Sequence, residues 1–315
     1  MEFQILLDCI LVIISIVMLW KGADWLVDSA AEIAHSFKIS DLIIGLTVVA
    51  FGTSAPEFAV TISAAFTNQT DISIGNVIGS NIFNLGFILG GTAIIRPIAV
   101  SQKLFNRDGL FLLMSTALIF ILFFGINGWD LGDSFTQIEG LLLFFMLIGY
   151  IVFLFIKKDP PEEIHPSTAT KSSYLFFLIG LVLIVSGGHL MVEHASNVAR
   201  FMGISDWVIA VTIVAAGTSA PEFATSISAA LKGRHGIAIG NLIGSDLFNL
   251  LGVLGLAGII NPSSISQDIY NSTFILVLMV GLTLLMMRTF WRISRIEGFI
   301  LVSINLIRWY YDLSA

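Results

Sequence analysis

Charged residues are scarce in this chain of 315 residues, and that scarcity indicates its class. Lys, Arg, Asp and Glu make up 12% of the sequence and hydrophobic residues 56%, with a mean hydropathy of +0.93. Soluble domains carry about 25% charged residues. Half of that value, in a sequence this apolar, excludes an ordinary soluble protein and indicates one that folds in lipid. The formal net charge of −7 gives no sign of nucleic-acid binding.

Cysteine and polar segments are nearly absent as well. The one cysteine, Cys9, excludes an intramolecular disulfide and lies in an apolar run, where helix packing is its expected role. The N-terminus has no basic start and no small-residue cleavage site follows, so we expect the first apolar run to remain as a span. Without a long polar domain, the chain is expected to act at membrane depth, with the lipid bilayer as its partner and no cofactor.

Long apolar runs, by contrast, fill the sequence. A membrane helix needs roughly 20 mostly apolar residues. Ten stretches qualify: 5–33, 41–66, 72–95, 109–127, 136–156, 174–199, 206–231, 237–260, 270–288 and 296–313. The sequence therefore predicts an all-α integral membrane protein with ten transmembrane helices.

Basic residues are distributed unevenly between the connections. With the N-terminus outside, the inward connections hold Lys38, Arg96, Lys103, Arg107, Lys157, Lys158, Lys171, Lys232, Arg234, Arg288, Arg292 and Arg295, and the outward ones only Arg200 and Arg308. Cytoplasmic loops carry the excess of Lys and Arg. We therefore expect a multi-pass protein of the cell membrane with both termini outside.

A shift of 165 residues aligns the chain with itself. Residues 22–97 match 187–262 without a gap, with 38 identities in 76 positions, which marks a duplication. The polar segment 157–173 divides the spans five and five, giving repeats 1–156 and 174–315 around a cytoplasmic linker. Because five is odd, the second repeat is expected to enter the membrane from the opposite side. Such inverted five-helix repeats are a transporter architecture.

Each repeat carries a glutamate inside an apolar helix. Glu57 and Glu222 lie in identical octapeptides, Gly-Thr-Ser-Ala-Pro-Glu-Phe-Ala, at 52–59 and 217–224. A charge at the centre of a membrane helix costs about 2.5–3.5 kcal/mol even on insertion scales, and only Lys21 offers a basic group near that depth. A bound cation or a proton is the expected partner. Permanently protonated packing glutamates are the structural alternative.

Proline precedes both glutamates. Pro56 and Pro221 lack the N–H that the carbonyls of Gly52 and Gly217 would accept, so each helix is expected to break there. Free carbonyls at membrane depth are tolerated only where they line a cavity or bind something. Broken helices at the bilayer midplane are the usual coordination device for Na⁺ and H⁺ in transporters.

Hydroxyl and amide side chains accompany the glutamates in both repeats. They are Thr53, Ser54, Thr218 and Ser219 beside the glutamates, and Ser80, Asn84, Ser245 and Asn249 in the next helix. Ser80 and Asn84 are four apart and share a helix face, as do their equivalents. All are hard oxygen ligands without His or Cys, which suits Ca²⁺ and disfavours zinc and copper. Mg²⁺, which sheds water reluctantly, fits less well.

These paired blocks resemble the α-repeats of the cation/Ca²⁺ exchanger superfamily, above all its compact prokaryotic sodium/calcium exchangers. The resemblance covers nearly the whole chain and implies a secondary active antiporter, not an enzyme, that exchanges Na⁺ for Ca²⁺ by alternating access at the midplane. It also implies the ligand set: Glu57, Glu222, Thr53, Ser54, Thr218, Ser219, Ser80, Ser245, Asn84 and Asn249, with the main-chain carbonyls of Ala50 and Ala215. In such proteins the first and sixth helices slide against the rest.

Two positions depart from the family pattern or from the internal symmetry. Asn249 stands where many prokaryotic and potassium-dependent relatives carry Asp, which weakens any case for K⁺ cotransport. Asp246 stands where the first repeat has Asn81. Its two interpretations are a place beside the ion site or permeation path, and a local packing role.

Other functions stay open at this stage. A proton/Ca²⁺ antiporter is the close alternative, since buried glutamates can cycle protons, although a proton needs no cage of Ser, Thr and Asn oxygens. An intramembrane hydrolase would use the glutamates as acid and base, and a passive channel would conduct without coupling. Transport stoichiometry and oligomeric state do not follow from the sequence, and a monomer is the working expectation.

Overall fold

The computed structural model of the chain describes residues 2–124, 134–157, 169–204, 209, 213 and 215–314. The helices of the first half are α1 (Glu2–Phe37), α2 (Asp41–Ile44), α3 (Ala50–Thr53), α4 (Ala55–Phe66), α5 (Thr70–Phe83), α6 (Gly90–Ile95), α7 (Leu110–Phe124) and α8 (Gln137–Lys157). Those of the second half are α9 (Lys171–Phe201), α11 (Ala215–Thr218), α12 (Ala220–Leu231), α13 (His235–Leu247), α14 (Leu254–Ile260), α15 (Gln267–Arg288) and α16 (Arg295–Ser314). Within these described residues, four π-helical segments continue them: η1 (Gly45–Val49), η2 (Asn84–Leu89), η3 (Leu104–Gly109) and η5 (Phe248–Val253).

Seven helical stretches of the described residues are long and apolar enough to cross a membrane: 4–37, 70–95, 104–123, 137–157, 171–201, 235–260 and 267–288. An eighth is the pair 41–53 and 55–66, which is bent by 51°. All eight coincide with predicted spans, and the chain is a multi-pass membrane protein. The predicted span 206–231 lies partly outside the described residues, and α16 occupies the range of the last one.

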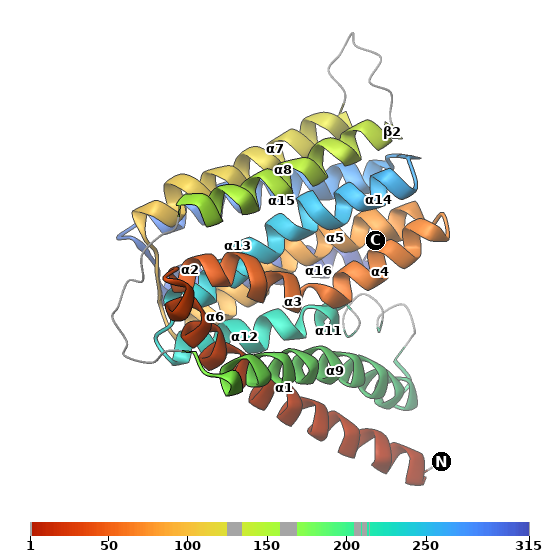
Figure 1. Cartoon of the computed structure of the whole chain (residues 1–315). Coiled ribbons are helices and arrows are strands. Elements are labelled where there is room, and N and C mark those ends of the chain that lie inside the picture. The colour runs from red at the N-terminus through yellow and green to blue at the C-terminus, as the bar shows by residue number, and fades with distance from the viewer. Residues whose placement is uncertain are drawn as a thin grey trace.

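Helices of the two halves are intermingled rather than separated (Figure 1). α1 and α9 lie side by side along one edge of the molecule, and α7 and α8 lie along the opposite edge. Buried apolar side chains form a smaller cluster around α1 and α9 and a larger one around α5, α7, α8, α13 and α15. The segments that carry the two identical octapeptides of the repeat lie between these two edges.

Glycines allow α13 to touch the segment that leads to α3. A Cβ at Gly244 would lie 2.6 Å from the Leu46 carbonyl oxygen, and one at Gly240 would lie 2.9 Å from that of Leu42. These two glycines therefore serve the close packing of the two segments. At the equivalent Gly75 and Gly79, an added Cβ would meet no heavy atom of the described residues within 4 Å, so no packing contact is seen there.

Two short strand pairs, which the apolar pattern did not predict, join the halves. β1 (Ile98–Ala99) pairs antiparallel with β4 (Arg292–Ile293), and β2 (Ser134–Phe135) pairs antiparallel with β3 (Ser263–Ser264). Ile98 faces Ile293, and Phe135 faces Ser263. Each pair thus takes one strand from each half.

The two strand pairs lie at opposite ends of the long helix formed by α13, η5 and α14. β1 lies beside His235, where this helix begins, and β3 follows its last residue, Ile260. The start of α5, at Thr70, lies beside Phe135 and Ser263 of the second strand pair. α5 and α13, which are equivalent in the repeat, therefore begin at opposite ends of the molecule.

Candidate ion-binding site

Both glutamates lie in the first turn of a helix that follows a break. Ser54 separates α3 from α4 with φ −79° and ψ 8°, and Ser219 separates α11 from α12 with φ −89° and ψ 8°. Pro56 and Pro221 occupy the first turns after the breaks, where no helical N–H is required of them. The predicted breaks before Glu57 and Glu222 are confirmed.

The two breaks face each other and exchange hydrogen bonds. Ser54 Oγ donates to Glu222 Oε1 at 3.0 Å, and Ser219 Oγ donates to Glu57 Oε1 at 2.9 Å. The two bonds are equivalent under the shift of 165 residues. Both glutamates are 1% exposed. Each repeat therefore holds the carboxylate of the other in a buried place.

α13 adds further oxygen atoms around Glu222. Ser245 Oγ donates to Glu222 Oε1 at 3.4 Å. Thr53 Oγ1 lies 3.4 Å from Ser245 Oγ, 3.1 Å from Asn241 Oδ1 and 3.2 Å from the Ala50 carbonyl oxygen. Four of the predicted ligand positions thus meet within one hydrogen-bonded group.

Two asparagines that the sequence analysis did not assign to the site support the glutamates from their main-chain side. Asn76 Nδ2 donates to the Glu57 carbonyl at 3.3 Å, and Asn241 Nδ2 donates to the Glu222 carbonyl at 3.4 Å. Each also donates to a hydroxyl one turn further along the glutamate helix. The sequence did carry a signal for these two residues, because the equivalent positions 76 and 241 of the second repeated block are both asparagine.

A second polar layer links α5 to α13. Asn84 Nδ2 donates to Asp246 Oδ1 at 3.0 Å, and Asn249 Nδ2 donates to Asn81 Oδ1 at 3.1 Å. Asn81 Nδ2 also donates to the Asp246 carbonyl at 3.0 Å. All four side chains are at most 1% exposed. The π-helical segments η2 and η5 begin at this layer, and such insertions in a helix are frequent at functional sites.

Several buried oxygens here lack a hydrogen-bond partner within the described residues. They are Glu57 Oε2, Glu222 Oε2, Asn84 Oδ1, Asn249 Oδ1 and Asp246 Oδ2. In the same part of the chain no Lys or Arg forms an ion pair with either glutamate. A buried acceptor without a donor is costly, and a cation supplies what such oxygens lack. The all-oxygen set fits hard cations such as Na⁺ and Ca²⁺.

Comparison with known proteins identifies the family. The family model described as sodium/calcium exchanger protein matches residues 8–156 and 172–310. The chain belongs to the sodium/calcium exchanger family. This confirms the resemblance seen in the paired octapeptides, and it makes the chain a member of a transporter family.

Relatives of this exchanger-family chain match it over nearly their full length. It is 37% identical over 316 residues to the putative antiporter CaxA of Alkalimonas amylolytica, covering 94% of this chain and 96% of the relative. It is 32% identical over 337 residues to the sodium/calcium exchanger MaX1 of Methanosarcina acetivorans, covering 95% and 96%. The solved structure of the sodium-calcium exchanger NCX_Mj soaked with 2.5 mM Na⁺ and 10 mM Sr²⁺ superposes with a TM-score of 0.83, at 32% identity, covering 96% of this chain and 98% of that one.

The remaining ligand positions predicted for an exchanger lie on α3, α5 and α11. Ser80 is buried on α5, and Thr218 ends α11 directly before the second break. Ala50 begins α3, and its carbonyl accepts from the Ser54 N–H at 3.0 Å. Ala215 begins α11. Which of these atoms bind a transported ion stays a prediction.

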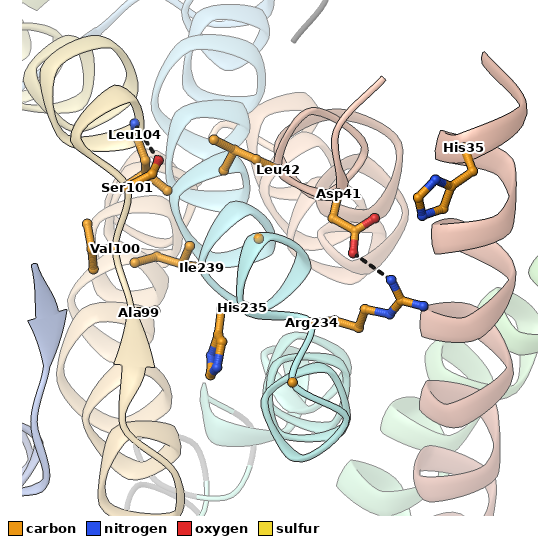
Figure 2. A pocket seen from close by; sticks show the side chains of 12 residues that line it. His35, Asp41, Leu42, Ala99, Val100, Ser101, Leu104, Arg234, His235 and Ile239 are labelled. Carbon is orange, nitrogen blue, oxygen red and sulfur yellow. Dashed lines mark hydrogen bonds and ion pairs between the residues drawn. The ribbon is translucent and has the colours of Figure 1, made fainter. Parts of the chain in front are cut away.

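Cavities open at the start of α13 and beside the first break. One of about 360 Å³ opens at the start of α13, where Arg234 Nη1 lies 3.3 Å from Asp41 Oδ2 and His35 and His235 line the wall (Figure 2). It shares no lining residue with the glutamate site. Another of about 290 Å³ is apolar and reaches Ser54 at the first break.

Proposed function

We propose that this chain is a secondary antiporter that exchanges Na⁺ for Ca²⁺, with the transported ions bound between Glu57 and Glu222. The observation that carries this proposal is the arrangement of the two carboxylates. Each uses Oε1 to accept from a serine of the other repeat and keeps a buried Oε2 without a partner among the described residues. The printed names of MaX1 and NCX_Mj, both sodium/calcium exchangers, support the choice of ions.

Charge balance explains how one site couples two ions. Two carboxylates neutralise one Ca²⁺ or two Na⁺, so the two kinds of ion compete for the same oxygens. Without an ion, the site would carry uncompensated charge at membrane depth. A conformational change that moves the site is therefore favoured only when it is loaded, which prevents leakage of either gradient.

Neutral oxygens complete the coordination. Ca²⁺ takes six to eight oxygen ligands at about 2.3–2.6 Å, more than two carboxylates supply. We propose the hydroxyls of Thr53, Ser54, Thr218, Ser219, Ser80 and Ser245, the amides of Asn84 and Asn249, and the carbonyls of Ala50 and Ala215 as the further ligands. A smaller set serves each Na⁺.

The architecture that we propose for transport is ten spans in two inverted repeats, 1–156 and 174–315, with the broken helices at the midplane. The opposite starting points of α5 and α13 and the strand pairs at opposite ends of the molecule support inversion. Alternating access then follows when the α1 and α9 pair, which lies along one edge of the molecule, moves against the other helices.

The basic residues support an orientation in the cell membrane. Arg96, Lys232, Arg234 and Arg295 gather at the end that carries the first strand pair, where Arg234 contacts Asp41 and Arg295 donates to the Ile95 carbonyl at 3.4 Å. We propose that this end, with the linker 157–173, faces the cytoplasm and that both termini lie outside.

Transport in proteoliposomes tests the function. Vesicles loaded with Na⁺ are diluted into Na⁺-free buffer with trace ⁴⁵Ca²⁺, and uptake is compared with vesicles lacking the Na⁺ gradient. We expect uptake that requires the outward Na⁺ gradient and is lost in Glu57→Gln. Uptake that follows a pH gradient and ignores Na⁺ would replace this proposal with proton/Ca²⁺ exchange.

Glu297→Gln provides a matched control. Glu297 Oε2 accepts from the Ser294 N–H at 2.7 Å at the start of α16, outside the ion site. Glutamine serves equally in this capping arrangement, so the control should transport like the unmodified protein.

A further inference from the structure

Asp246 is a buried carboxylate that the glutamate site does not use, and the repeat contains a natural control for it. Its equivalent in the first repeat is Asn81. Asn84 donates to Asp246 at 3.0 Å, and Asn249 donates to Asn81 at 3.1 Å, so the two contacts are equivalent. An amide accepts this hydrogen bond in one half just as a carboxylate does in the other. Packing therefore does not require a negative charge at residue 246.

The charge has no protein counterpart within the described part of the chain. Asp246 is 0% exposed, and its recorded side-chain partner is the neutral amide of Asn84. Its Oδ2 has no hydrogen-bond partner there. A buried carboxylate needs a counter-charge. An external cation or a proton must supply it.

The neighbours of Asp246 favour a cation. Asn84 Oδ1 and Asn249 Oδ1 are also buried and without a partner among the described residues. These oxygens are acceptors that a metal ion could satisfy, and one proton could satisfy only one of them. Asp246 and Asn249 are three residues apart and share a helix face, with Asn84 bonded to Asp246 from α5.

This layer adjoins the glutamate site. Ser245, directly before Asp246 on α13, donates to Glu222 Oε1 at 3.4 Å. A cation in this layer would therefore lie close enough to the glutamate site to repel Ca²⁺ there. A cation therefore occupies this layer when the protein is loaded with Na⁺ and not when it is loaded with Ca²⁺.

We propose that Asp246, together with the amide oxygens of Asn84 and Asn249, forms a Na⁺ subsite next to the glutamates. The proposal rests on Na⁺/Ca²⁺ exchange at Glu57 and Glu222. One carboxylate with neutral oxygens balances a monovalent ion, whereas the two glutamates balance Ca²⁺. Asp246 strengthens the competition of Na⁺ against Ca²⁺ without holding Ca²⁺ itself.

Ion competition on purified protein tests the subsite without a transport assay. ⁴⁵Ca²⁺ binding in detergent is titrated with NaCl at constant ionic strength, with choline chloride as the balancing salt. For Asp246→Asn we expect Ca²⁺ affinity in the absence of Na⁺ to change by no more than about threefold. The Na⁺ concentration for half-displacement should rise about tenfold, equal to about 1.4 kcal/mol, because one attractive charge is lost.

A second variant guards against misfolding. The double variant Asn81→Asp/Asp246→Asn keeps the composition of the layer and moves the carboxylate to the equivalent position. In this double variant we expect the Na⁺ concentration for half-displacement of Ca²⁺ to lie within about threefold of that of the unmodified protein. A loss as large as that of Asp246→Asn would overturn the claim that a carboxylate in this layer, rather than the fold around residue 246, sets the competition by Na⁺.

The outcomes separate this inference from the proposed function. Ca²⁺ binding that survives Glu57→Gln unchanged would reject the glutamate site itself. Ca²⁺ binding that is lost in Glu57→Gln, together with a Na⁺ titration of Asp246→Asn that matches the unmodified protein, would reject only the role of Asp246. A further outcome concerns the proton. If displacement of Ca²⁺ by Na⁺ depends on pH in the unmodified protein, and Asp246→Asn removes this pH dependence but leaves the Na⁺ dependence, the counter-charge of Asp246 is a proton and the subsite is rejected.

Discussion

Two of the regions that bury a carboxylate among the described residues differ in what surrounds it. Between α1 and α9, Asp8 is 1% exposed, with its Oδ1 2.7 Å from His194 Nδ1 and 3.4 Å from Asn197 Nδ2. Between the two breaks, Glu57 is equally buried, yet its Oε2 has no partner among the described residues. Burial of an acid therefore does not identify an ion site. What distinguishes Glu57 from Asp8 is a buried carboxylate oxygen without a partner among the described residues.

The other acidic residues of α1 follow the first pattern. Asp24 accepts from Ser228 at 2.8 Å, Lys232 Nζ lies 2.8 Å from Asp28 Oδ2, and Glu32 accepts from Ser173. These contacts tie α1 to α9 and α12. These acids of α1 hold helices together, whereas we propose that the acids at the breaks bind ions.

The largest effect is expected from neutralising either glutamate. Glu57→Gln or Glu222→Gln keeps the oxygen that accepts from the serine and removes one charge, which should lower Ca²⁺ affinity more than about a hundredfold. Equilibrium ⁴⁵Ca²⁺ binding measures it, with Glu297→Gln as the control. If either glutamine variant bound Ca²⁺ as tightly as the unmodified protein, the buried acids at the breaks would not differ in function from Asp8.

Asp8→Asn should show the reverse pattern. Loss of the charge beside His194 weakens this pair and should lower the free energy of unfolding. Thermal unfolding in ion-free detergent solution checks this, and Glu57→Gln, which removes an uncompensated charge, should not be destabilised. A fall in Ca²⁺ affinity for Asp8→Asn without any loss of stability would contradict the assignment.

The serines at the breaks should give smaller and equal effects. Ser54→Ala and Ser219→Ala each remove one donor to the glutamate of the other repeat and one candidate ligand. Each should weaken Ca²⁺ binding by about tenfold, since a hydrogen bond to a charged group contributes about 1.5 kcal/mol. Titration of the two variants side by side is the measurement. A tenfold difference between them would show that the repeats do not contribute equally.

The smallest effect is expected at the edge of the α1 region. Lys232→Gln removes the pairs with Asp24 and Asp28, which are partly exposed. Exposed pairs contribute about 0–1 kcal/mol, so thermal stability should fall by less than about 1 kcal/mol and Ca²⁺ binding should be unchanged. A large loss of binding would instead make this acidic face part of the ion pathway.

Much of the site was visible in the sequence because the repeat and its chemistry are local. The two prolines predicted the breaks, and the hydroxyls beside the glutamates proved to lie around them. What the sequence could not give is the exchange between repeats, in which Ser54 serves Glu222 and Ser219 serves Glu57. The first contact joins residues 168 positions apart and the second joins residues 162 positions apart, and no local pattern encodes either.

The π-helical segments and the strand pairs were equally hidden. η2 and η5 change the helical register at Asn84 and Asn249 through a single extra residue, which apolar periodicity does not register. The strands have two residues each, too few for an alternating pattern. The sequence showed that Asp246 breaks the symmetry of the repeat, but only the tertiary structure shows that its Oδ2 lacks a partner among the described residues.

The most direct test of the account is the position of a bound ion. Crystals of the protein grown with Ca²⁺, or with Sr²⁺ for its anomalous signal, should show an ion between the two breaks, within about 2.3–2.6 Å of Glu57 Oε2 and Glu222 Oε2 for Ca²⁺. The account predicts that both oxygens ligate the same ion. An ion bound elsewhere, with both oxygens still lacking a partner, would contradict it.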